Sequence, residues 1–392
     1  MKISSIKKLK NLKDKVVFLR VDFNVALDNG KIKDDYRIVA GLETINYLLE
    51  KGARLIVATH LGEPKGKPEE KYSVKPVALR LKKLLGLPVK FLPEIVGSKV
   101  VKAVNELKSG EVLMLENLRF NPGELSNDLK FAKELVSLAD IYVNDAYSVC
   151  HRDQASVSAV KKYLTSYTGL LLEKEVVAVS KILKPKKPLV VIMGGSKIGT
   201  KAPLISKLYA SANQILLGGA LANNFFKYQK LEIGKSLFDA DSLAYVKNFF
   251  KGKKIASKII LPLDVVIKTK LGKVMVRKPK EVKKDEMILD IGPDTIALYA
   301  KYIKTAQTLV WNGPMGKFEE ASFKQGTLSI ARLVASRAGG RAYGLVGGGE
   351  TVAALNLTKM AEHVDWISTA GGAMLTHLGG GKMPGLNKIV LK

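Results

Sequence analysis

The sequence predicts an α/β fold in which short parallel strands alternate with helices, arranged as two halves joined by a helix. Short apolar runs are repeatedly followed by amphipathic segments, which is the βα pattern of a parallel sheet. Most of these runs end in polar or glycine-rich turns, at the edge where such sheets bind ligands. Between the halves, Leu170–Leu183 has apolar residues at helical spacing and ends before Pro185 and Pro188, so we expect one stiff connecting helix.

The composition fits a protein with sizeable hydrophobic cores and no export signal. Hydrophobic residues make up 47% of the 392 residues, and this length suggests roughly two or three domains. Cys150 is the single cysteine, which excludes an internal disulfide and fits a reducing compartment. The charged N-terminus, MKISSIKKLKNLKDK, lacks the apolar stretch of a signal peptide, and no apolar run is long enough to span a bilayer. We therefore expect a cytoplasmic protein without a membrane partner.

The formal net charge of +28 indicates an anionic partner, and nucleic acid is the first candidate. Against nucleic acid, the excess is largely lysine spread along the chain, and aromatic residues are only 7%. The densest stretch, Lys251–Lys284, alternates apolar and basic residues around Leu271-Gly272, as a β-hairpin with one solvated face does. We interpret these lysines as a solvated face. The positive field could also steer anionic metabolites toward the protein.

In the first half, the strand Val16–Arg20 runs into Asp22 and Asn24, which are two residues apart and therefore point to one face. Polar side chains at the carboxyl end of a parallel strand face the ligand crevice, although an Asx-type turn explains the same pattern. Two aspartates then suit the start of an amphipathic helix, whereas Arg37 in its first turn opposes the helix dipole. A cation placed against helix stability points to function.

Three further strands of this half, Arg54–Thr59, Val112–Leu115 and Ile141–Val143, are each followed by basic side chains. These side chains could converge with Arg37 on one rim, because the carboxyl ends of parallel strands share an edge of the sheet. Arginine binds phosphate and carboxylate bidentately, so such a cluster suits a small ligand that carries both groups. Each residue alone is also explained as an ordinary surface charge, but four at equivalent positions weaken that alternative. The four are Arg37, His60, Arg119 and Arg152.

In the second half, the stretch Leu189–Lys201, LVVIMGGSKIGTK, combines a buried strand, a glycine turn and two lysines. Gly194 and Gly195 allow a tight turn and a close approach of the backbone to a ligand. Lys197 and Lys201 are four apart and share a face if a helix starts here, which makes an anion site at the helix start. A strand-to-helix turn with two solvated lysines explains the pattern equally well, since neither GxxxxGK[ST] nor GxGxxG is present.

Glycine-rich turns after strands recur in this half, at positions 194, 218, 347 and 371. Gly347, Gly348 and Gly349 at a helix N-terminus offer free backbone N–H groups to a phosphate. Glu350 beside them could hold Mg²⁺, which prefers carboxylate and phosphate oxygens. Close packing of a strand against a helix explains one such turn, but it is a strained explanation for four of them.

These motifs, in this order, resemble the phosphoglycerate kinase family along essentially the full length of the chain. The resemblance implies two Rossmann-like domains, each with a doubly wound parallel sheet: residues 1–168 with a tail 378–392 that packs back on them, a hinge helix 169–184, and residues 185–377. It also implies reversible in-line transfer of the acyl phosphate of 1,3-bisphosphoglycerate to Mg-ADP after domain closure, giving 3-phosphoglycerate and ATP. The matching segments are Arg20–Val25 (RVDFNV), Asp35–Arg37, His60–Gly62, Leu115–Phe120 (LENLRF), His151-Arg152, Gly194–Lys201, Trp311–Glu319 (WNGPMGKFE), Gly347–Thr351 and Ser368–Ala373.

The resemblance assigns site residues by their positions in this sequence. Those for the phosphoglycerate substrate are Asp22, Phe23, Asn24, Arg37, His60, Leu61, Gly62, Glu63, Arg119 and Arg152, with His60, Arg119 and Arg152 at the phosphate far from the acyl group. Those for the nucleotide are Gly194, Gly195, Lys197, Lys201, Gly218, Gly219, Asn312, Pro314, Glu319, Gly347, Gly348, Gly349, Glu350 and Thr351, with Glu350 on Mg²⁺, Glu319 on the ribose and Gly218-Gly219 near the base. The catalytic residues are Arg37, Lys201 and Gly349, and the two cations neutralise the transferring phosphoryl group.

The sequence departs from the family pattern at two of these positions. Glu63 replaces the arginine of the usual HLGRP motif, and Glu350 replaces an aspartate after the three glycines. Glu350 keeps the charge, so we expect metal binding to survive. A glutamate aimed at a substrate phosphate would repel it, so we expect Glu63 to turn away and pair with Lys65 or Lys67. The alternative is that Glu63 faces the site and the enzyme tolerates a high KM.

Two other classes of protein stay open on the residues alone. A dehydrogenase on Rossmann-like domains would bind NAD, but no GxGxxG follows the first strand. A nucleic-acid-binding protein is suggested by charge alone, and we expect no specific nucleic-acid partner. The expected partners are 3-phosphoglycerate or 1,3-bisphosphoglycerate and ATP or ADP, and the family implies a monomer.

Overall fold

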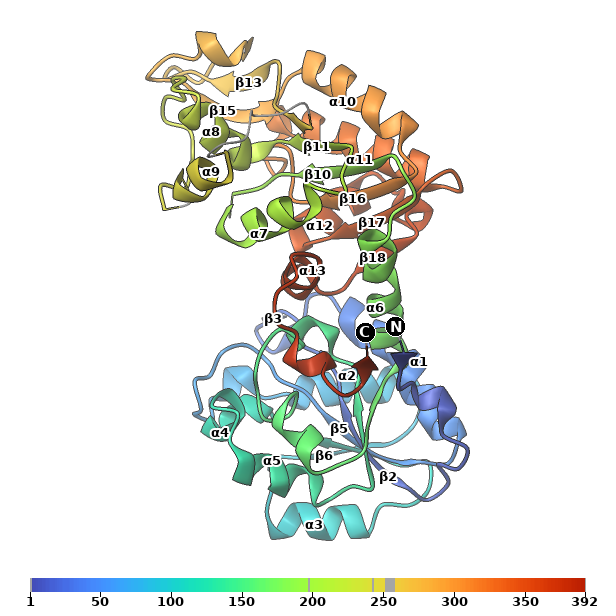
Figure 1. Ribbon diagram of the computed structural model, residues 1–392. Helices are drawn as coiled ribbons and strands as arrows, with labels where there is room; N and C mark the ends of the chain where they lie inside the picture. Colours follow the sequence, from blue (N-terminus) through green and yellow to red (C-terminus); the bar gives the residue numbers. More distant parts are fainter. Residues whose placement is uncertain (1, 197, 242, 251–257, 392) are drawn as a thin grey trace. The chain divides into compact units, whose positions relative to one another are not determined.

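The computed structural model describes residues 2–196, 198–241, 243–250 and 258–391 (Figure 1). The chain divides into two compact units: unit 1 consists of Met1–Val177 and Lys382–Lys392, and unit 2 consists of Ala178–Gly381. Helix α6, Leu170–Leu183, contains the point at which unit 1 continues into unit 2, and its bounds are those predicted. Among the described helices, none has the length and the apolar run that a membrane span requires.

Unit 1 is built on a six-stranded sheet whose strands are all parallel. The strands are β2 (Val16–Arg20), β5 (Arg54–Ala58), β6 (Val89–Leu92), β7 (Val112–Leu115), β8 (Ile141–Asn144) and β9 (Ser166–Thr168). Their order, β6-β7-β5-β2-β8-β9, places β2 between β5 and β8, so the direction of winding reverses at β2. Open α/β sheets bind ligands at the carboxyl ends of the strands beside such a reversal point.

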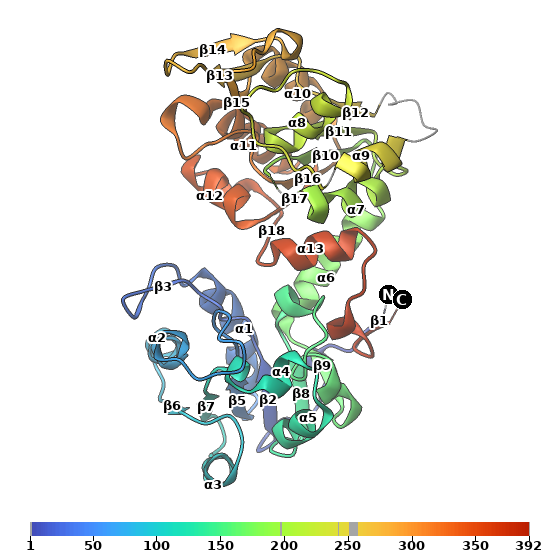
Figure 2. The same cartoon turned by 90° about the vertical axis from the view of Figure 1, so that its left-hand side faces the viewer.

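Helices cover both faces of this sheet because its central strands are apolar on both sides. The helices are α1 (Tyr36–Glu50), α2 (Lys75–Leu85), α3 (Ser98–Asn105), α4 (Pro122–Leu125) and α5 (Leu129–Val136). In β2, Val17 and Leu19 share a core with α1 and α2, whereas Val16 and Phe18 share a core with α3 and α5. This alternation follows from the two-residue period of a strand. Figure 2 shows α1 and α2 on one side of the sheet and α5 on the other.

Unit 2 repeats the architecture with a second parallel six-stranded sheet, so the predicted fold class is confirmed. The strands are β10 (Leu189–Met193), β11 (Gln214–Leu217), β12 (Ile259–Ile260), β16 (Thr308–Asn312), β17 (Tyr343–Gly347) and β18 (Trp366–Ser368). Their order, β12-β11-β10-β16-β17-β18, puts the reversal of winding at β10, between β11 and β16. The glycine turn singled out after Leu189–Met193 therefore lies at the ligand-binding edge of this sheet.

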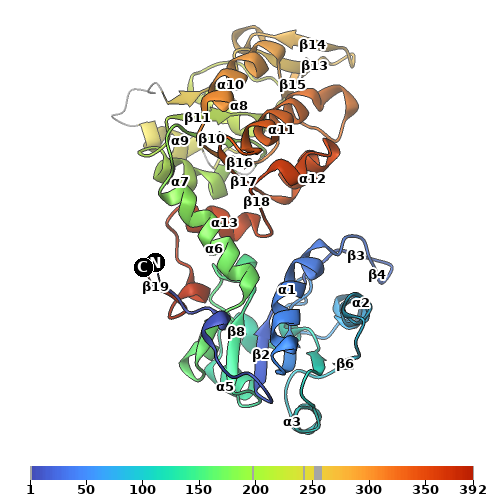
Figure 3. The ribbon, with the colours of Figure 1, turned by 90° about the vertical axis from the view of Figure 1, so that its right-hand side faces the viewer.

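The helices of unit 2 also cover two faces. They are α7 (Ile198–Leu208), α8 (Gly219–Tyr228), α9 (Leu243–Phe250), α10 (Pro293–Thr305), α11 (Gln325–Ala338), α12 (Gly349–Leu357) and α13 (Gly371–Leu378). Tyr299 of α10 and Val334 of α11 share a core with Val190 and Ile192 of β10. In Figure 3, α10 and α11 lie together on one side of the sheet.

Shorter strands complete the fold. The hairpin predicted around Leu271-Gly272 is confirmed, because β13 (Val265–Lys268) and β14 (Val274–Arg277) pair antiparallel. A third strand that we did not predict, β15 (Met287–Ile291), pairs with β13 on its other edge. Two small antiparallel pairs belong to unit 1: β3 (Leu27–Asp28) with β4 (Lys31–Ile32), and β1 (Lys2–Ile3) with β19 (Val390–Leu391).

The C-terminal tail that ends in β19 is held on unit 1 by a buried lysine. The ammonium of Lys161 donates to the carbonyls of Pro384 and Asn387, and the N–H of Gly385 donates to the carbonyl of Cys150 at 2.9 Å. The Lys161 side chain is buried, and this burial lowers its pKa to about 8. The tail carbonyls offset part of that desolvation cost.

Lys161→Ala should loosen the tail without disturbing the sheet. A hydrogen bond from a charged group stabilises by about 1.5–3 kcal/mol, so the amides of Gly385 and Ile389 should exchange with solvent at least about tenfold faster. Hydrogen exchange measures this directly. The matched control is Lys162→Ala, since Lys162 is the exposed neighbour, and it should leave both amides unchanged. Equal protection in the Lys161 and Lys162 variants would show that Lys161 does not hold the tail.

Candidate functional site

The first element of the site in unit 1 is an ion pair at the carboxyl end of β2. Nη1 of Arg37 lies 2.5 Å from Oδ2 of Asp22, and the hydroxyl of Ser148 donates to the same carboxylate. The Asp22 side chain is 9% exposed and that of Arg37 is 33% exposed. Arg37 thus sits in the first turn of α1, where the dipole opposes it, because a carboxylate at the end of the neighbouring strand holds it there.

Arg20, the last residue of β2, connects this site to the interior and is fully buried. Its Nε donates to the hydroxyl of Ser156 at 2.9 Å, and that hydroxyl donates to Oε1 of Glu124 at 2.6 Å. Oε2 of Glu124, also fully buried, accepts from the N–H of Ser156 at 2.9 Å. A buried guanidinium and a buried carboxylate therefore meet on one hydroxyl, which compensates both charges. This network was not predicted from the sequence, although Arg20, a charged residue at the end of an apolar strand, was a signal for it.

His60 is 3% exposed, and its hydrogen bonds fix its tautomer. Its Nδ1 lies 3.1 Å from Nη2 of Arg20, and because arginine only donates, Nδ1 must accept and the proton resides on Nε2. Burial, followed by the positive charge of Arg20 and the surrounding arginines, holds the pKa of His60 well below its ordinary value. A neutral ring does not form an ion pair with Asp22, whose Oδ1 lies 3.9 Å from Nδ1. His60 can therefore offer a ligand one N–H, at Nε2.

Arg119 and Arg152 hold Glu63 between them. Nη1 of Arg119 donates to the carbonyl of Gly62 at 2.7 Å and lies 3.6 Å from Oε1 of Glu63, while Nη1 of Arg152 lies 3.7 Å from that oxygen. The Arg119 side chain is 2% exposed, and burial, followed by repulsion from neighbouring arginines, lowers its pKa to about 10. In the part of the chain that the structure describes, Nε and Nη2 of Arg119 have no hydrogen-bond partner. Donors for a further anion are therefore present.

The position of Glu63 corrects our expectation from the sequence. The carboxylate does not turn away to Lys65 or Lys67: its ion pairs among the described residues are with Arg119 and Arg152. The physical reason is that two guanidinium groups, one of them buried, attract a carboxylate more strongly than an ammonium in a solvated loop does. Glu63 therefore faces two of the four basic residues grouped from the sequence, Arg119 and Arg152, which was the alternative we had considered.

The other residues that we predicted to bind the substrate belong to the core or fix the loops around the basic residues. Phe23 and Leu61 are 1% and 3% exposed, so their side chains belong to the core. Oδ1 of Asn24 accepts from the N–H of Gly62 at 2.9 Å and so fixes the loop that carries Glu63. The N–H of Asn24 donates to Oδ1 of Asp22 at 3.2 Å, so the Asx-type turn considered from the sequence is also present.

In unit 2, the glycine turns after β10 and β11 pack backbone to backbone against the turn after β16. The N–H of Gly195 donates to the carbonyl of Pro314 at 2.7 Å, and the N–H of Gly219 donates to that of Met315 at 2.8 Å. Gly219 has φ +58°, and a Cβ there would lie 2.7 Å from the nitrogen of Gly195. A Cβ on Gly194 would lie 2.0 Å from the carbonyl oxygen of Pro314. Close packing, our alternative explanation, therefore accounts for these turns.

The turn after β17 has a different character. A Cβ on Gly349, the first residue of α12, would meet nothing within 4 Å, so packing does not explain this glycine. The start of α12 instead leaves room for a ligand near backbone N–H groups. Asn312 and Thr351 hold the turns together, since Nδ2 of Asn312 donates to the carbonyl of Gly347 at 2.6 Å and the hydroxyl of Thr351 accepts from the N–H of Gly313 at 2.7 Å.

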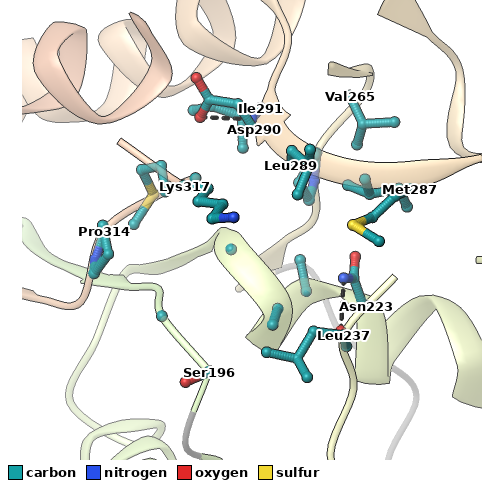
Figure 4. A pocket seen from close by; sticks show the side chains of 18 of the residues that line it. Ser196, Asn223, Leu237, Val265, Met287, Leu289, Asp290, Ile291, Pro314 and Lys317 are labelled. Atoms are coloured by element: carbon teal, nitrogen blue, oxygen red, sulfur yellow. Dashed lines mark hydrogen bonds between the residues drawn. The ribbon is translucent and has the colours of Figure 1, made fainter. Parts of the chain in front are cut away.

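A cavity of about 320 Å³ opens beside these turns, within the size range of small-molecule sites. One part of its wall comes from α8, the loop after it and β15, and is apolar apart from Asn223 and Asp290; another part is polar and includes Ser196 and Lys317 (Figure 4). Burial raises the pKa of Asp290 to about 7. The cavity brings together five of the predicted nucleotide residues, namely Gly195, Gly219, Pro314, Glu319 and Glu350.

The remaining predicted nucleotide residues lie around this wall or beyond it. Lys201 is buried, and its ammonium donates to the carbonyl of Gly194, directly after β10. Gly218 continues β11 into α8, and its N–H donates to the carbonyl of Met193 at 2.9 Å. Gly348 is the N-cap of α12 and has φ +98°. Lys197 lies outside the described residues.

Sequence reasoning missed the apolar wall of the cavity. Phe226, Leu237 and Met287 line it, together with Asn223. Figure 4 shows Leu237, Met287 and Asn223, whose Nδ2 donates to the carbonyl of Leu237 at 2.9 Å. The available signals were Phe226 in the helix that follows Gly218 and Gly219, and the apolar start of β15. Neither signal shows that α8 and β15 lie side by side.

For a metal, the carboxylate of the cavity wall that lies at the start of α12 is that of Glu350. Glu350 is exposed in the first turn of α12 and lines the cavity wall. Across the described residues, no group of three or more His, Cys, Asp or Glu side chains could hold a metal ion. This donor set fits Mg²⁺, which is commonly bound by one or two carboxylates together with substrate phosphates rather than by an all-protein cage.

Fold and site together define a class of protein. Each unit is a doubly wound α/β sheet with a candidate ligand site at its reversal point. One site gathers guanidinium and imidazole groups, and the other combines backbone N–H groups with a cavity. The class is a transferase that acts on phosphorylated metabolites.

Comparison with known proteins supports this class of protein. The model of the phosphoglycerate kinase family matches residues 6–381. Phosphoglycerate kinase of Koribacter versatilis is 44% identical over 402 aligned residues, covering 99% of each chain, and that of Borreliella burgdorferi is 41% identical over 391, covering 98% of this chain and 99% of the relative. The solved phosphoglycerate kinases of Coxiella burnetii and Pyrococcus horikoshii superpose with TM-scores of 0.87 and 0.85. Their identities are 38% and 30%, and their coverage of both chains is 98% and 97%.

The chain therefore belongs to the phosphoglycerate kinase family. Its reaction is the reversible transfer of a phosphoryl group between 1,3-bisphosphoglycerate and ADP. The dehydrogenase and the nucleic-acid-binding protein, which the residues alone left open, are not supported by these comparisons.

The geometry of His60 predicts its protonation state. Because its pKa is lowered in the folded protein, the stability it contributes is present above the unfolded value of about 6.5 and is lost as the pH falls below it. Long-range ¹H–¹⁵N correlation spectra should show, between pH 6.5 and 8, a neutral ring with Nδ1 unprotonated and Nε2 protonated. A ring that titrates near 6.5, or that carries its proton on Nδ1, would contradict the assigned hydrogen bond with Arg20.

Proposed function

We propose that unit 1 binds 3-phosphoglycerate or 1,3-bisphosphoglycerate and that unit 2 binds Mg-ADP or Mg-ATP. The observation that carries this proposal is the contrast between the two reversal points. Guanidinium and imidazole groups at β2 suit a small, highly charged ligand. Glycine turns beside an apolar cavity at β10 suit a ligand with both phosphates and a base.

In unit 1, we assign the two ends of the substrate to two groups of side chains. Arg119, Arg152 and Nε2 of His60 bind the phosphate that is not transferred, since the first has unpaired donors and the last has a fixed N–H. Arg37, oriented by Asp22, binds the carboxylate or acyl phosphate end. Phe23, Asn24, Leu61 and Gly62 shape the loops between these ends.

In unit 2, we assign the apolar part of the cavity to the base and the polar part to the ribose and phosphates. Glu319 accepts from the ribose hydroxyls, and the start of α12 donates N–H groups to the phosphates. Glu350 holds Mg²⁺, which neutralises phosphate charge when it is bound. Gly195 and Gly219 bring closely packed backbone to the wall of the cavity, and Lys197 and Lys201 supply positive charge.

Transfer requires the acyl phosphate and the nucleotide to meet in line, with reacting atoms within about 3–3.5 Å. We therefore propose that the two units close around their ligands and that α6 acts as the hinge. Arg37, Lys201 and the N–H of Gly349 then stabilise the charge on the transferring group, which is most of what this chemistry requires of a protein. We further propose that the enzyme works as a monomer, as its family implies, and in the cytoplasm, since its one cysteine suits a reducing compartment.

A coupled assay with 3-phosphoglycerate and Mg-ATP tests this function, and Lys201→Ala and Arg37→Ala test the assigned catalysts. Each substitution should lower kcat on the order of 10²–10³-fold, as removal of one transition-state donor does, with little change in nucleotide Kd. Lys207→Ala is the control, because Lys207 is an exposed lysine in the last turn of the same helix as Lys201. Near-native kcat in either variant would remove that residue from the catalytic set.

Glu350→Ala should separate metal-dependent from metal-independent nucleotide binding. Since Glu350 is the metal's proposed protein ligand, calorimetry should show a loss of most of the Mg²⁺-dependent gain in ADP affinity and a nearly unchanged affinity without Mg²⁺. Glu362→Ala, at an exposed glutamate of the same unit, should change neither affinity. Equal losses with and without Mg²⁺ would instead make Glu350 a structural residue of α12.

A further inference from the structure

We propose that Glu63 is a built-in competitor of the substrate. Its carboxylate occupies the anion position between Arg119 and Arg152, and the substrate's phosphate has to displace it. The identity of that substrate rests on the proposed function, whereas the position of the carboxylate comes from the structure alone.

The first observation is that one oxygen serves two cations. Oε1 of Glu63 lies 3.6 Å from Nη1 of Arg119 and 3.7 Å from Nη1 of Arg152, and the two arginines come from different loops of unit 1. Two guanidinium groups that converge on one oxygen of a carboxylate can bind an oxygen of a phosphate in the same way. Glu63 therefore stands where an oxygen of a bound phosphate would stand.

The second observation is that Arg119 is not otherwise open to solvent. Its side chain is only 2% exposed, and Nε and Nη2 have no hydrogen-bond partner among the described residues. The carboxylate of Glu63 lies at the one nitrogen, Nη1, that also binds the carbonyl of Gly62. A phosphate that reaches Nε and Nη2 of the same guanidinium lies beside this carboxylate, and the two anions repel each other, so binding favours exchange of one anion for the other.

The third observation is that Glu63 is free to leave. Its side chain is 72% exposed, in contrast to Arg119 beneath it. The neighbouring backbone is fixed, because Gly62 is bound through its N–H by Asn24 and through its carbonyl by Arg119. Displacement therefore needs only a rotation of the Glu63 side chain into solvent, with no movement of the loop.

The exchange costs every anion the same affinity, so the contacts made elsewhere in the site decide which anion still binds. An anion with a single charged group, such as inorganic phosphate, would have to displace Glu63 using only the contacts at Arg119, Arg152 and His60. A ligand with a second charged end gains a further contact at Arg37 and overcomes the competitor. Glu63 thus weakens the binding of both anions but leaves only the two-ended ligand with useful affinity.

The test compares Glu63→Gln, which keeps the size and removes the charge, with Glu70→Gln, which removes a charge from an exposed glutamate in the same connection between β5 and α2. In the coupled assay, Glu63→Gln should lower KM for 3-phosphoglycerate about three- to tenfold, with kcat and KM for ATP unchanged. In calorimetry on the unliganded protein, inorganic phosphate should bind more tightly to Glu63→Gln by a comparable factor. Both effects should shrink at high salt, and Glu70→Gln should show neither.

The outcomes separate the two proposals. Wild-type protein without turnover of 3-phosphoglycerate would refute the proposed function, while the phosphate titration would still decide whether Glu63 competes for the anion position. Active wild-type protein with an unchanged or raised KM in Glu63→Gln would overturn the competitor. An equal fall in KM in Glu70→Gln would also overturn it, because the effect would then belong to the net charge of the loop.

Discussion

Burial of positive charge at the carboxyl end of β2 is the constraint on which unit 1 depends. Arg20 is fully buried and Arg119 nearly so, and an unpaired charge in such a position is strongly destabilising. Glu124 and Ser156 compensate Arg20 from the interior, whereas Glu63 compensates Arg119 from the solvent side. Arg20 has interior partners and is therefore held in place. Within the part of the chain that the structure describes, Arg119 lacks a carboxylate partner in the interior, so its charge remains available to an anion from solvent.

The same positive charge determines the state of the histidine. His60 is surrounded by guanidinium groups and accepts from Arg20, so protonating it would add one more cation to a buried cluster. In the proposed site, the ring is therefore a neutral donor with a fixed direction rather than an acid or base. This suits phosphoryl transfer, in which positioning and charge neutralisation matter more than proton transfer at a remote phosphate.

Unit 2 forms its candidate anion site at the equivalent edge of its sheet, but with backbone groups instead of buried arginines. The turns at Gly194 and Gly219 pack so closely that side chains are excluded there, and hydrogen bonds from Gly195 and Gly219 to the Pro314–Met315 turn hold the rim in one shape. Lys201 contributes its charge from a buried position, bound to the carbonyl of Gly194. A rim built from backbone can approach phosphates closely without the desolvation cost of buried arginines.

Much of this could be predicted from the sequence because the signals are local. An apolar run such as Leu189–Met193 followed by glycines predicts both a strand and the turn at its carboxyl end, and Arg37 stood out by its conflict with the helix dipole. The orientation of Glu63 was predicted wrongly, because it depends on Arg119 and Arg152, which reach it from loops far away in the sequence. The apolar wall of the cavity was missed for the same reason, since it forms only where α8 and β15 meet.

The net charge of the chain gives a reason for the proposed role of Glu63. A formal charge of +28 produces a field that concentrates every small anion near the surface, not the substrate alone. Such a field raises the rate of encounter for every small anion, so inorganic phosphate reaches the site as well as a phosphorylated metabolite does. A carboxylate held at the anion position lowers the affinity of both. A strongly basic chain can therefore use a repulsive residue to keep the site from filling with the small anions that its own field concentrates.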